Sequence, residues 1–232
     1  MSRRRHIAAA AAAAALLCAA APQPTPAWDA PPQTRASTRP DAFRGGVEPI
    51  SPKLRERMTG VTWREGCPVG LGKLRLVRAT YVDFEGRPRQ GSVVVRDRYA
   101  RGVLQVLRRM YAKGFPIRRM ELIDRYGGDD HRSMRHDNTS AFNCRFVNGT
   151  SRWSEHAYGE AIDINPRENP YVSGSLVSPP EGAPYADRSL KRPGMIFRRD
   201  VVTGSFERIL GWKWGGLWPQ PTDYQHLSAG GT

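Results

Sequence analysis

The chain has 232 residues and a formal net charge of +14, with 36 Lys and Arg residues against 22 Asp and Glu. This length suffices for one domain with a hydrophobic core plus additional segments. The positive excess predicts attraction to a polyanion, such as DNA, an acidic membrane surface or an anionic cell wall. No nucleic-acid readout motif is recognisable, which argues against specific binding to DNA or RNA. An arginine-rich composition with solvated side chains would produce the same charge without any partner.

The N-terminus has the three parts of a secretory signal. Arg3-Arg4-Arg5 is followed by an alanine-rich apolar run and then by small residues. We expect a signal peptide over residues 1–27, with cleavage after Ala27 or, alternatively, after Ala21. The run is marginal for a membrane span, which needs about 20 apolar residues. Cys18 raises the alternative of a lipid anchor, but Leu17 precedes it where a small residue is usual. The sequence therefore predicts a secreted, cell-wall-associated protein without a transmembrane span after cleavage.

The next residues, 28–60, contain many Pro, Thr and Arg residues and little apolar periodicity, which predicts a disordered linker. A short helix is possible over residues 51–60, capped by Ser51 and with Pro52 in its first turn. The folded domain is expected to occupy residues 61–232.

Within that domain the apolar pattern predicts alternating short elements. A turn at 85–88 indicates a hairpin over 74–95, and Gly114 ends a helix that starts at Asp97. The polar segment 124–153 is long enough for a loop to be functional. The remaining predictions are strands at 117–123, 161–164, 212–214 and 224–227, a surface excursion at 165–199 and a helix at 200–210.

Export leaves two cysteines, Cys67 and Cys144. An oxidising compartment favours a disulfide between them, which would fix the start of the domain beside the central segment. Two buried free thiols are the alternative.

The central segment is Ser154-Glu155-His156-Ala157-Tyr158-Gly159-Glu160-Ala161-Ile162-Asp163. Gly159 permits a bend that would bring His156 and Asp163 together. Asp163 lies between two isoleucines, and a buried carboxylate needs a partner such as a cation. A second histidine, His226, follows Asp223 by three residues. Two imidazoles and a carboxylate are a usual protein set for one catalytic zinc with an open position.

A histidine and an aspartate at the spacing of His156 and Asp163 also occur often by chance. The alternative is that His156 is a surface residue and Asp163 caps a turn. In a regular strand Asp223 and His226 would point to opposite faces, so a common site requires a bulge or turn between them. Asp223 is the candidate general base. Arg145 and Arg135, both in the polar segment before His156, are the candidates for the residue that stabilises the oxyanion. We interpret His131 and His136 as surface residues, and Gly127-Gly128-Asp129-Asp130 lacks a full calcium ligand set.

At these residues the chain resembles the VanY-like D-Ala-D-Ala carboxypeptidases and L-Ala-D-Glu endopeptidases, zinc peptidases that share the hedgehog/DD-peptidase fold. The resemblance is carried by Ser154-x-His156-x-x-Gly159-x-Ala161-x-Asp163, Asp223-x-x-His226, Tyr126-Gly127-Gly128-Asp129-Asp130, Asn138 to Arg145 and Trp214-Gly215-Gly216-x-Trp218. It implies an α+β fold with a small antiparallel sheet and helices packed on one side. It also implies His156, Asp163 and His226 as zinc ligands, Asp223 as the base and Arg145 as the substrate arginine.

The implied substrate is a peptidoglycan stem peptide, and the export signal and basic surface agree with it. Whether a terminal D-Ala or an internal bond is cut stays open. A non-catalytic wall-binding or signalling module that keeps the fold and the metal is the alternative function. Asp223 discriminates the two, because a pure binder needs no base. We expect the protein to be a monomer.

Overall fold

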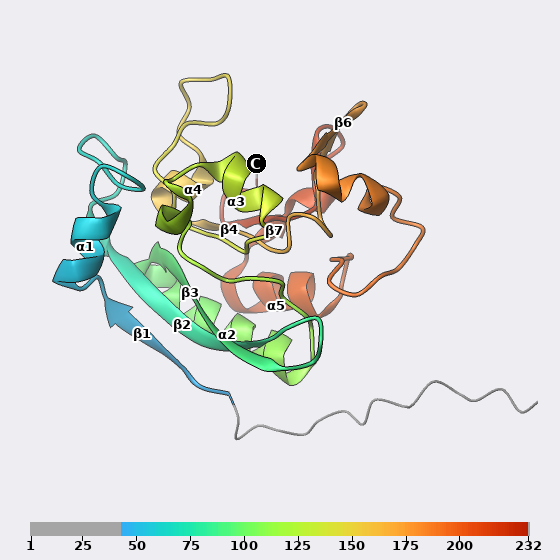
Figure 1. Ribbon diagram of the computed structural model, residues 1–232, viewed down its shortest axis with the longest axis horizontal. Helices are drawn as coiled ribbons and strands as arrows, with labels where there is room; N and C mark the ends of the chain where they lie inside the picture. The colour runs from blue at the N-terminus through green and yellow to red at the C-terminus, as the bar shows by residue number, and fades with distance from the viewer. Residues whose placement is uncertain (1–42, 232) are drawn as a thin grey trace, which may run out of the picture. The chain divides into compact units, whose positions relative to one another are not determined.

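A computed structural model describes residues 43–231 of the protein (Figure 1). The predicted signal peptide and residues 28–42 of the predicted linker lie outside the described residues. The described residues all belong to one compact unit. Among them, no helix combines the length and apolar character that a membrane crossing requires.

The base of the domain is an antiparallel sheet in the order β1-β2-β3. Its strands are β1 (Gly45–Pro49), β2 (Leu74–Val82) and β3 (Pro88–Arg96). Val77 of β2 lies opposite both Val47 of β1 and Val93 of β3. The predicted hairpin is therefore confirmed as β2 and β3.

Both faces of this sheet are covered, because successive side chains of a strand point to opposite sides. Val77 and Ala79 share one hydrophobic cluster with α2 (Asp97–Ala112), and Leu74 and Leu76 share another with α1 (Pro52–Met58). Figure 1 shows α2 running along the sheet, with α5 (Val201–Leu210) close to it. Helix α5 is capped by the side chain of Asp200, as the sequence predicts for a helix at 200–210.

Part of the predicted linker belongs to the domain. Helix α1 forms as expected, because the Ser51 side chain accepts a hydrogen bond from Leu54 N at 3.2 Å and Pro52 occupies the first turn. Strand β1 precedes it and pairs with β2. The predicted boundary at Val61 therefore requires correction, since ordered structure extends at least to Gly45. Strand β1 was not predictable because its side chains are exposed or half-buried and show no apolar alternation.

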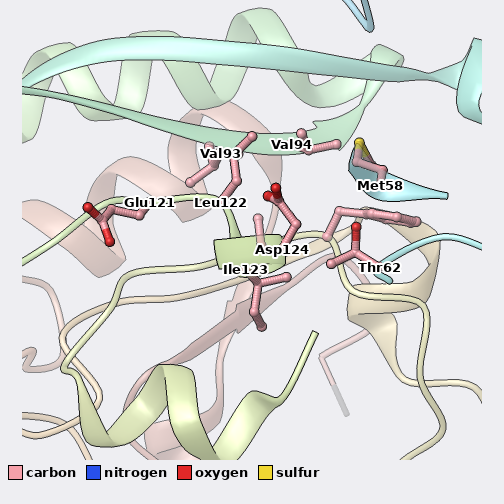
Figure 2. Close-up of a pocket in the computed structure, with 10 residues that line it drawn as sticks. Met58, Thr62, Val93, Val94, Glu121, Leu122, Ile123 and Asp124 are labelled. Atoms are coloured by element: carbon pink, nitrogen blue, oxygen red, sulfur yellow. The ribbon is translucent and has the colours of Figure 1, made fainter. Parts of the chain in front are cut away.

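Helix α1 is tied to the centre of the domain through Asp124. Arg57 donates to Asp124 Oδ2 from Nε at 2.9 Å and from Nη2 at 2.5 Å. Figure 2 shows the Asp124 carboxylate beneath β3, where a small cavity separates this strand from η3 (Ile123–Tyr126). Met58 of α1 and Ala141 both line this cavity. Helix α1 therefore lies close to the segment that precedes the central motif.

The strand predicted at 117–123 does not form. Its backbone groups bond to three separate partners: Ile117 N donates to Val82 O, Met120 O accepts from Ser92 N, and Arg119 O accepts from Thr139 N. No continuous ladder results. Ile117, Met120 and Ile123 are buried, so the apolar pattern of this segment reflects burial and not strand pairing.

Two further small antiparallel sheets complete the domain, in the orders β4-β9-β7 and β6-β5-β8. The α+β class with antiparallel strands is confirmed, although the strands divide among three sheets instead of one. The remaining elements are η2 (Leu71–Lys73), α3 (Asp130–Arg135), α4 (Glu155–Tyr158), β4 (Ala161–Asp163), β5 (Tyr171–Ser173), β6 (Leu176–Ser178), η4 (Pro180–Tyr185), β7 (Lys213–Trp214), η5 (Gly215–Leu217), β8 (Thr222–Asp223) and β9 (His226–Ser228).

The disulfide between Cys67 and Cys144 is present. It joins the segment before β2 to the segment before α4, across 77 positions of sequence. Cys144 is buried beside Leu54 and Met58 in the cluster under α1. Its backbone is also held without the disulfide, because Cys144 N donates to Thr62 O and Arg64 donates to Cys144 O.

A buried acidic pair joins the excursion that the sequence placed on the surface to the polar segment 124–153. The side chains of Glu168 and Asp137 are 0% and 1% exposed, and both approach Arg118, at 3.4 and 3.5 Å. Burial, followed by a hydrogen bond to Asp137, raises the pKa of Glu168 from 4.5 to about 8. Glu168 is therefore mostly protonated at neutral pH, which avoids two adjacent buried negative charges.

This pair predicts a loss of stability as the pH rises. A carboxyl whose pKa is higher in the folded than in the unfolded state stabilises the fold fully below its unfolded pKa. That stabilisation disappears as the pH rises from about 5 to about 8. We expect Glu168→Gln, which keeps a neutral donor, to be more stable than wild type at pH 8 by about 2 kcal/mol but not at pH 5. Urea unfolding at both pH values measures this. Glu181→Gln, at an exposed position, should follow the wild type. Parallel pH dependences of wild type and Glu168→Gln would refute the prediction.

Candidate metal centre

His156 is positioned by a single helical turn with a defined start and end. The Ser154 side chain caps α4 by accepting a hydrogen bond from His156 N at 3.3 Å. The turn ends at Gly159, whose φ of +69° favours glycine. A Cβ atom at Gly159 would also lie 2.7 Å from Arg96 N. The bend expected at this glycine is therefore present, and both conformation and space require glycine there.

Asp163 and His226 face each other across two paired strands. Asp163 ends β4, His226 begins β9, and the two are direct partners in the antiparallel register. Asp163 also exchanges two backbone hydrogen bonds with Ser140, at 2.8 and 3.0 Å. The backbone of Asp163 is thus held on one side by β9 and on the other by Ser140, which fixes the position from which its carboxylate extends.

The three predicted ligands converge in the protein interior. Their ligand atoms all lie within 4.8 Å of one another, and all three residues are buried. Asp163 Oδ2 is 3.2 Å from His156 Nε2, and Asp163 Oδ1 is 3.0 Å from His226 Nδ1. The two imidazole nitrogens are 3.3 Å apart. The structure therefore brings together Asp163 and His226, which are 63 positions apart in sequence, and His156, which lies within α4.

The orientation of His156 leaves a free lone pair toward the cluster. Its Nδ1 lies 2.6 Å from the carbonyl oxygen of Ala141, which can accept only from a protonated nitrogen. In the neutral ring Nε2 is then unprotonated and faces Asp163 and His226. A hydrogen bond from the outer nitrogen to a carbonyl is the usual support for a metal-binding histidine.

The electrostatics of the cluster favour a cation. Burial alone would raise the pKa of Asp163, but contact with His156 and His226 outweighs it, so this pKa lies far below its ordinary value. Burial alone would lower the pKa of His156, but the charge of Asp163 outweighs it and the pKa is raised. An anionic oxygen and two imidazole nitrogens that converge in the interior fit the ligand chemistry of zinc.

Asp223 lies at the edge of this cluster. It ends β8, which pairs with β5, whereas His226 begins β9 in another sheet. Tyr224 and Gln225 connect the two sheets. This connection interrupts the regular strand between Asp223 and His226, as a common site for the two side chains requires. Asp223 Oδ1 is buried and has no hydrogen-bond partner among the described residues. Burial and then the charge of Asp163 raise the pKa of Asp223 to about 6.

The Trp-Gly-Gly-x-Trp segment supports Asp223 and His226. A Cβ atom on Gly215 would lie 2.6 Å from Asp223 O and 3.1 Å from its Cβ, so only glycine permits this approach. The Trp214 indole donates to Tyr224 O at 2.8 Å. The Trp218 ring lies 5.5 Å from the His226 ring. The tryptophans thus serve both the core and the wall of the site.

Of the two candidate arginines, the structure brings Arg145 to the site. Asn143 N donates to His156 O at 3.2 Å and Ser154 N donates to Arg145 O at 3.1 Å, so the backbone of this segment follows the start of α4. Arg135 instead lies exposed in the last turn of α3. The sequence reasoning missed the Ala141 carbonyl, which no side-chain motif reveals.

Both aspartates of the Gly-Gly-Asp-Asp motif form contacts within the protein. Asp129 caps α3 by accepting a hydrogen bond from Arg132 N at 3.0 Å, and Asp130 forms an ion pair with Arg145. The sequence reasoning missed Asp130, for which the doubled aspartate was the available signal. His131 and His136 are exposed, as expected, and lie outside the metal cluster.

A small α+β domain with a buried His–Asp–His cluster beside a further carboxylate defines the type of site that metallopeptidases use. Residues 148–229 match the sequence model of a family described as D-alanyl-D-alanine carboxypeptidase. This match supports the resemblance to the VanY-like peptidases and supports peptidase activity. It covers His156, Asp163, Asp223 and His226 but begins after Arg145. No curated protein and no solved structure matches the chain.

Proposed function

We propose that the protein is a secreted zinc metallopeptidase that hydrolyses peptide bonds of peptidoglycan stem peptides. The observation that carries the proposal is the convergence of three buried ligand atoms within 4.8 Å. Asp223 adjoins them with an unpartnered carboxylate oxygen. The family match over residues 148–229 supports the same reaction class.

Each residue has a role in this proposal. His156, Asp163 and His226 hold one zinc ion, which supplies Lewis-acid polarisation of the scissile carbonyl and activation of water. Asp223 accepts the proton of the attacking water and passes it to the leaving amine. Its raised pKa keeps the carboxyl basic enough for this task near neutral pH. Arg145 donates to the substrate carbonyl oxygen as negative charge develops there.

Export and charge support the choice of substrate. The predicted signal peptide directs the chain out of the cell, and the net charge of +14 favours an anionic wall. We propose a monomer associated with the cell wall. A wall-binding module that retains the metal is the alternative function, and Asp223 favours the enzyme because a binder needs no proton acceptor.

The proposal predicts about one zinc per chain and hydrolysis that depends on it. Metal analysis and mass spectrometry of a stem pentapeptide incubated with the protein measure both. We expect a chelator or His226→Ala to remove the metal and the activity, and added zinc to restore only the wild type. The control His131→Ala, which changes an exposed histidine outside the cluster, should behave as wild type. Zinc binding without cleavage of any stem peptide or intact wall would favour the module, and absence of metal binding would refute the ligand assignment.

A further inference from the structure

The guanidinium of Arg145 is already engaged by the protein. Its Nη2 lies 2.7 Å from Asp130 Oδ2, and its Nη1 donates to Phe146 O at 3.3 Å. Its Nε is buried and has no hydrogen-bond partner among the described residues. Two of the five N–H donors of Arg145 are therefore already directed at protein oxygens, and its positive charge is paired with a carboxylate before any substrate binds.

Asp130 is held in place by the backbone around it. Asp129 caps α3 immediately before it, and Gly128 has a φ of +75°. A Cβ atom at Gly128 would lie 2.7 Å from Val61 O. The Asn143 side chain donates to Gly128 O at 3.0 Å and so links this turn to the segment of Arg145. Asp130 therefore faces Arg145 because the Gly-Gly-Asp-Asp turn is fixed to that same segment.

Both charges act at the metal cluster. Arg145 O accepts a hydrogen bond from Ser154 N, and Ser154 caps the helical turn that carries His156, so the ion pair lies next to the element that presents this ligand. Because the two charges are opposite and 2.7 Å apart, the site receives little net positive charge from Arg145. A free carboxylate entering beside this pair would lose hydration and meet Asp130 as a like charge.

We propose that Asp130 is a positioning and specificity residue: it fixes Arg145 and neutralises its charge, so that the site takes a stem peptide whose chain continues past the cleaved bond. On this proposal the protein is an endopeptidase and discriminates against a free carboxylate one residue beyond that bond. The inference rests on the proposed function, because it concerns the same metal site.

The test compares two products from one substrate. The zinc-loaded protein is incubated with a stem pentapeptide that ends in D-alanyl-D-alanine with a free carboxylate, and mass spectrometry separates terminal D-alanine release from internal cleavage. In the wild type we expect internal cleavage to exceed terminal release by at least about tenfold in kcat/KM. In Asp130→Asn this ratio should fall by about tenfold, mainly through a lower KM for terminal release. Asp130→Glu should retain the wild-type preference.

A second readout does not depend on turnover. Calorimetry compares the binding of D-alanyl-D-alanine as free acid and as C-terminal amide to the zinc-loaded protein. We expect the amide to bind more tightly to the wild type and the difference to vanish in Asp130→Asn. The control is Glu48→Gln, which removes a carboxylate paired with Arg78 at the outer strand β1 and should keep the wild-type preference.

The outcomes separate the two proposals. Preferential binding of the amide without any cleavage would contradict the proposed function while supporting the role of Asp130. Dominant terminal release by the wild type, an unchanged product ratio in Asp130→Asn, or failure to distinguish acid from amide would overturn the inference even if the protein is a peptidase.

Discussion

Asp223→Asn is expected to lower kcat for stem-peptide hydrolysis by about 10³-fold while the protein keeps its zinc. The substitution preserves the shape of the side chain and removes its ability to accept a proton. His156, Asp163 and His226 do not depend on it, because the strand pair β4–β9 and the turn α4 position them. KM should change little, since Asp223 acts on the attacking water and not on the bound peptide.

The pH dependence of the wild type tests the same role. A general base works in its ionised form, so activity should rise with pH through the pKa of Asp223. Burial and Asp163 raise that pKa to about 6, and a bound dication lowers it. We therefore expect the acid limb of kcat/KM at or somewhat below pH 6, and its absence from the residual activity of Asp223→Asn.

The control for this experiment is Asp187→Asn, which alters an exposed carboxylate bonded to Ser189 of its own loop. It should retain wild-type activity and metal. If Asp223→Asn kept more than about a tenth of the wild-type kcat, another group would have to accept the proton. If it lost the zinc, Asp223 would belong to the set of ligands instead.

The sequence was most informative where a residue acts locally. Ser51 and Pro52 define the start of α1, Gly159 ends α4, and Asp200 caps α5, because caps and left-handed turns depend on a few neighbouring residues. The same holds for the hairpin of β2 and β3, whose nine-residue strands are long enough to show apolar periodicity.

Short strands and long-range pairs were less predictable. Strands β4, β8 and β9 have two or three residues each, too few to carry a period, and their partners lie in distant parts of the chain. The metal cluster could be anticipated from residue types and family resemblance, but the direct pairing of Asp163 with His226 could not. The pair of Asp130 and Arg145 depends on the turn at Gly128 meeting Asn143, a contact that no local pattern encodes.

The second large effect is expected from the disulfide between Cys67 and Cys144. Replacing both residues by alanine should lower the free energy of unfolding by about 4 kcal/mol, because a cross-link over 77 positions restricts the unfolded chain strongly. Urea unfolding of oxidised protein measures this. Both proteins should carry Cys18→Ser, so that this cysteine cannot pair with another.

The same variant also tests how the disulfide serves the site. Arg145 follows Cys144 directly, whereas the three ligands are fixed by α4 and by the β4–β9 pair. Under conditions where the alanine variant is folded, we therefore expect a higher KM but an unchanged zinc content. The hydrogen bonds of Cys144 with Thr62 and Arg64 remain, so we expect this segment to become more mobile without leaving the site. A loss below about 1 kcal/mol would mean that these bonds and the packing under α1 already restrict this segment, and that the disulfide contributes little to either the fold or the site.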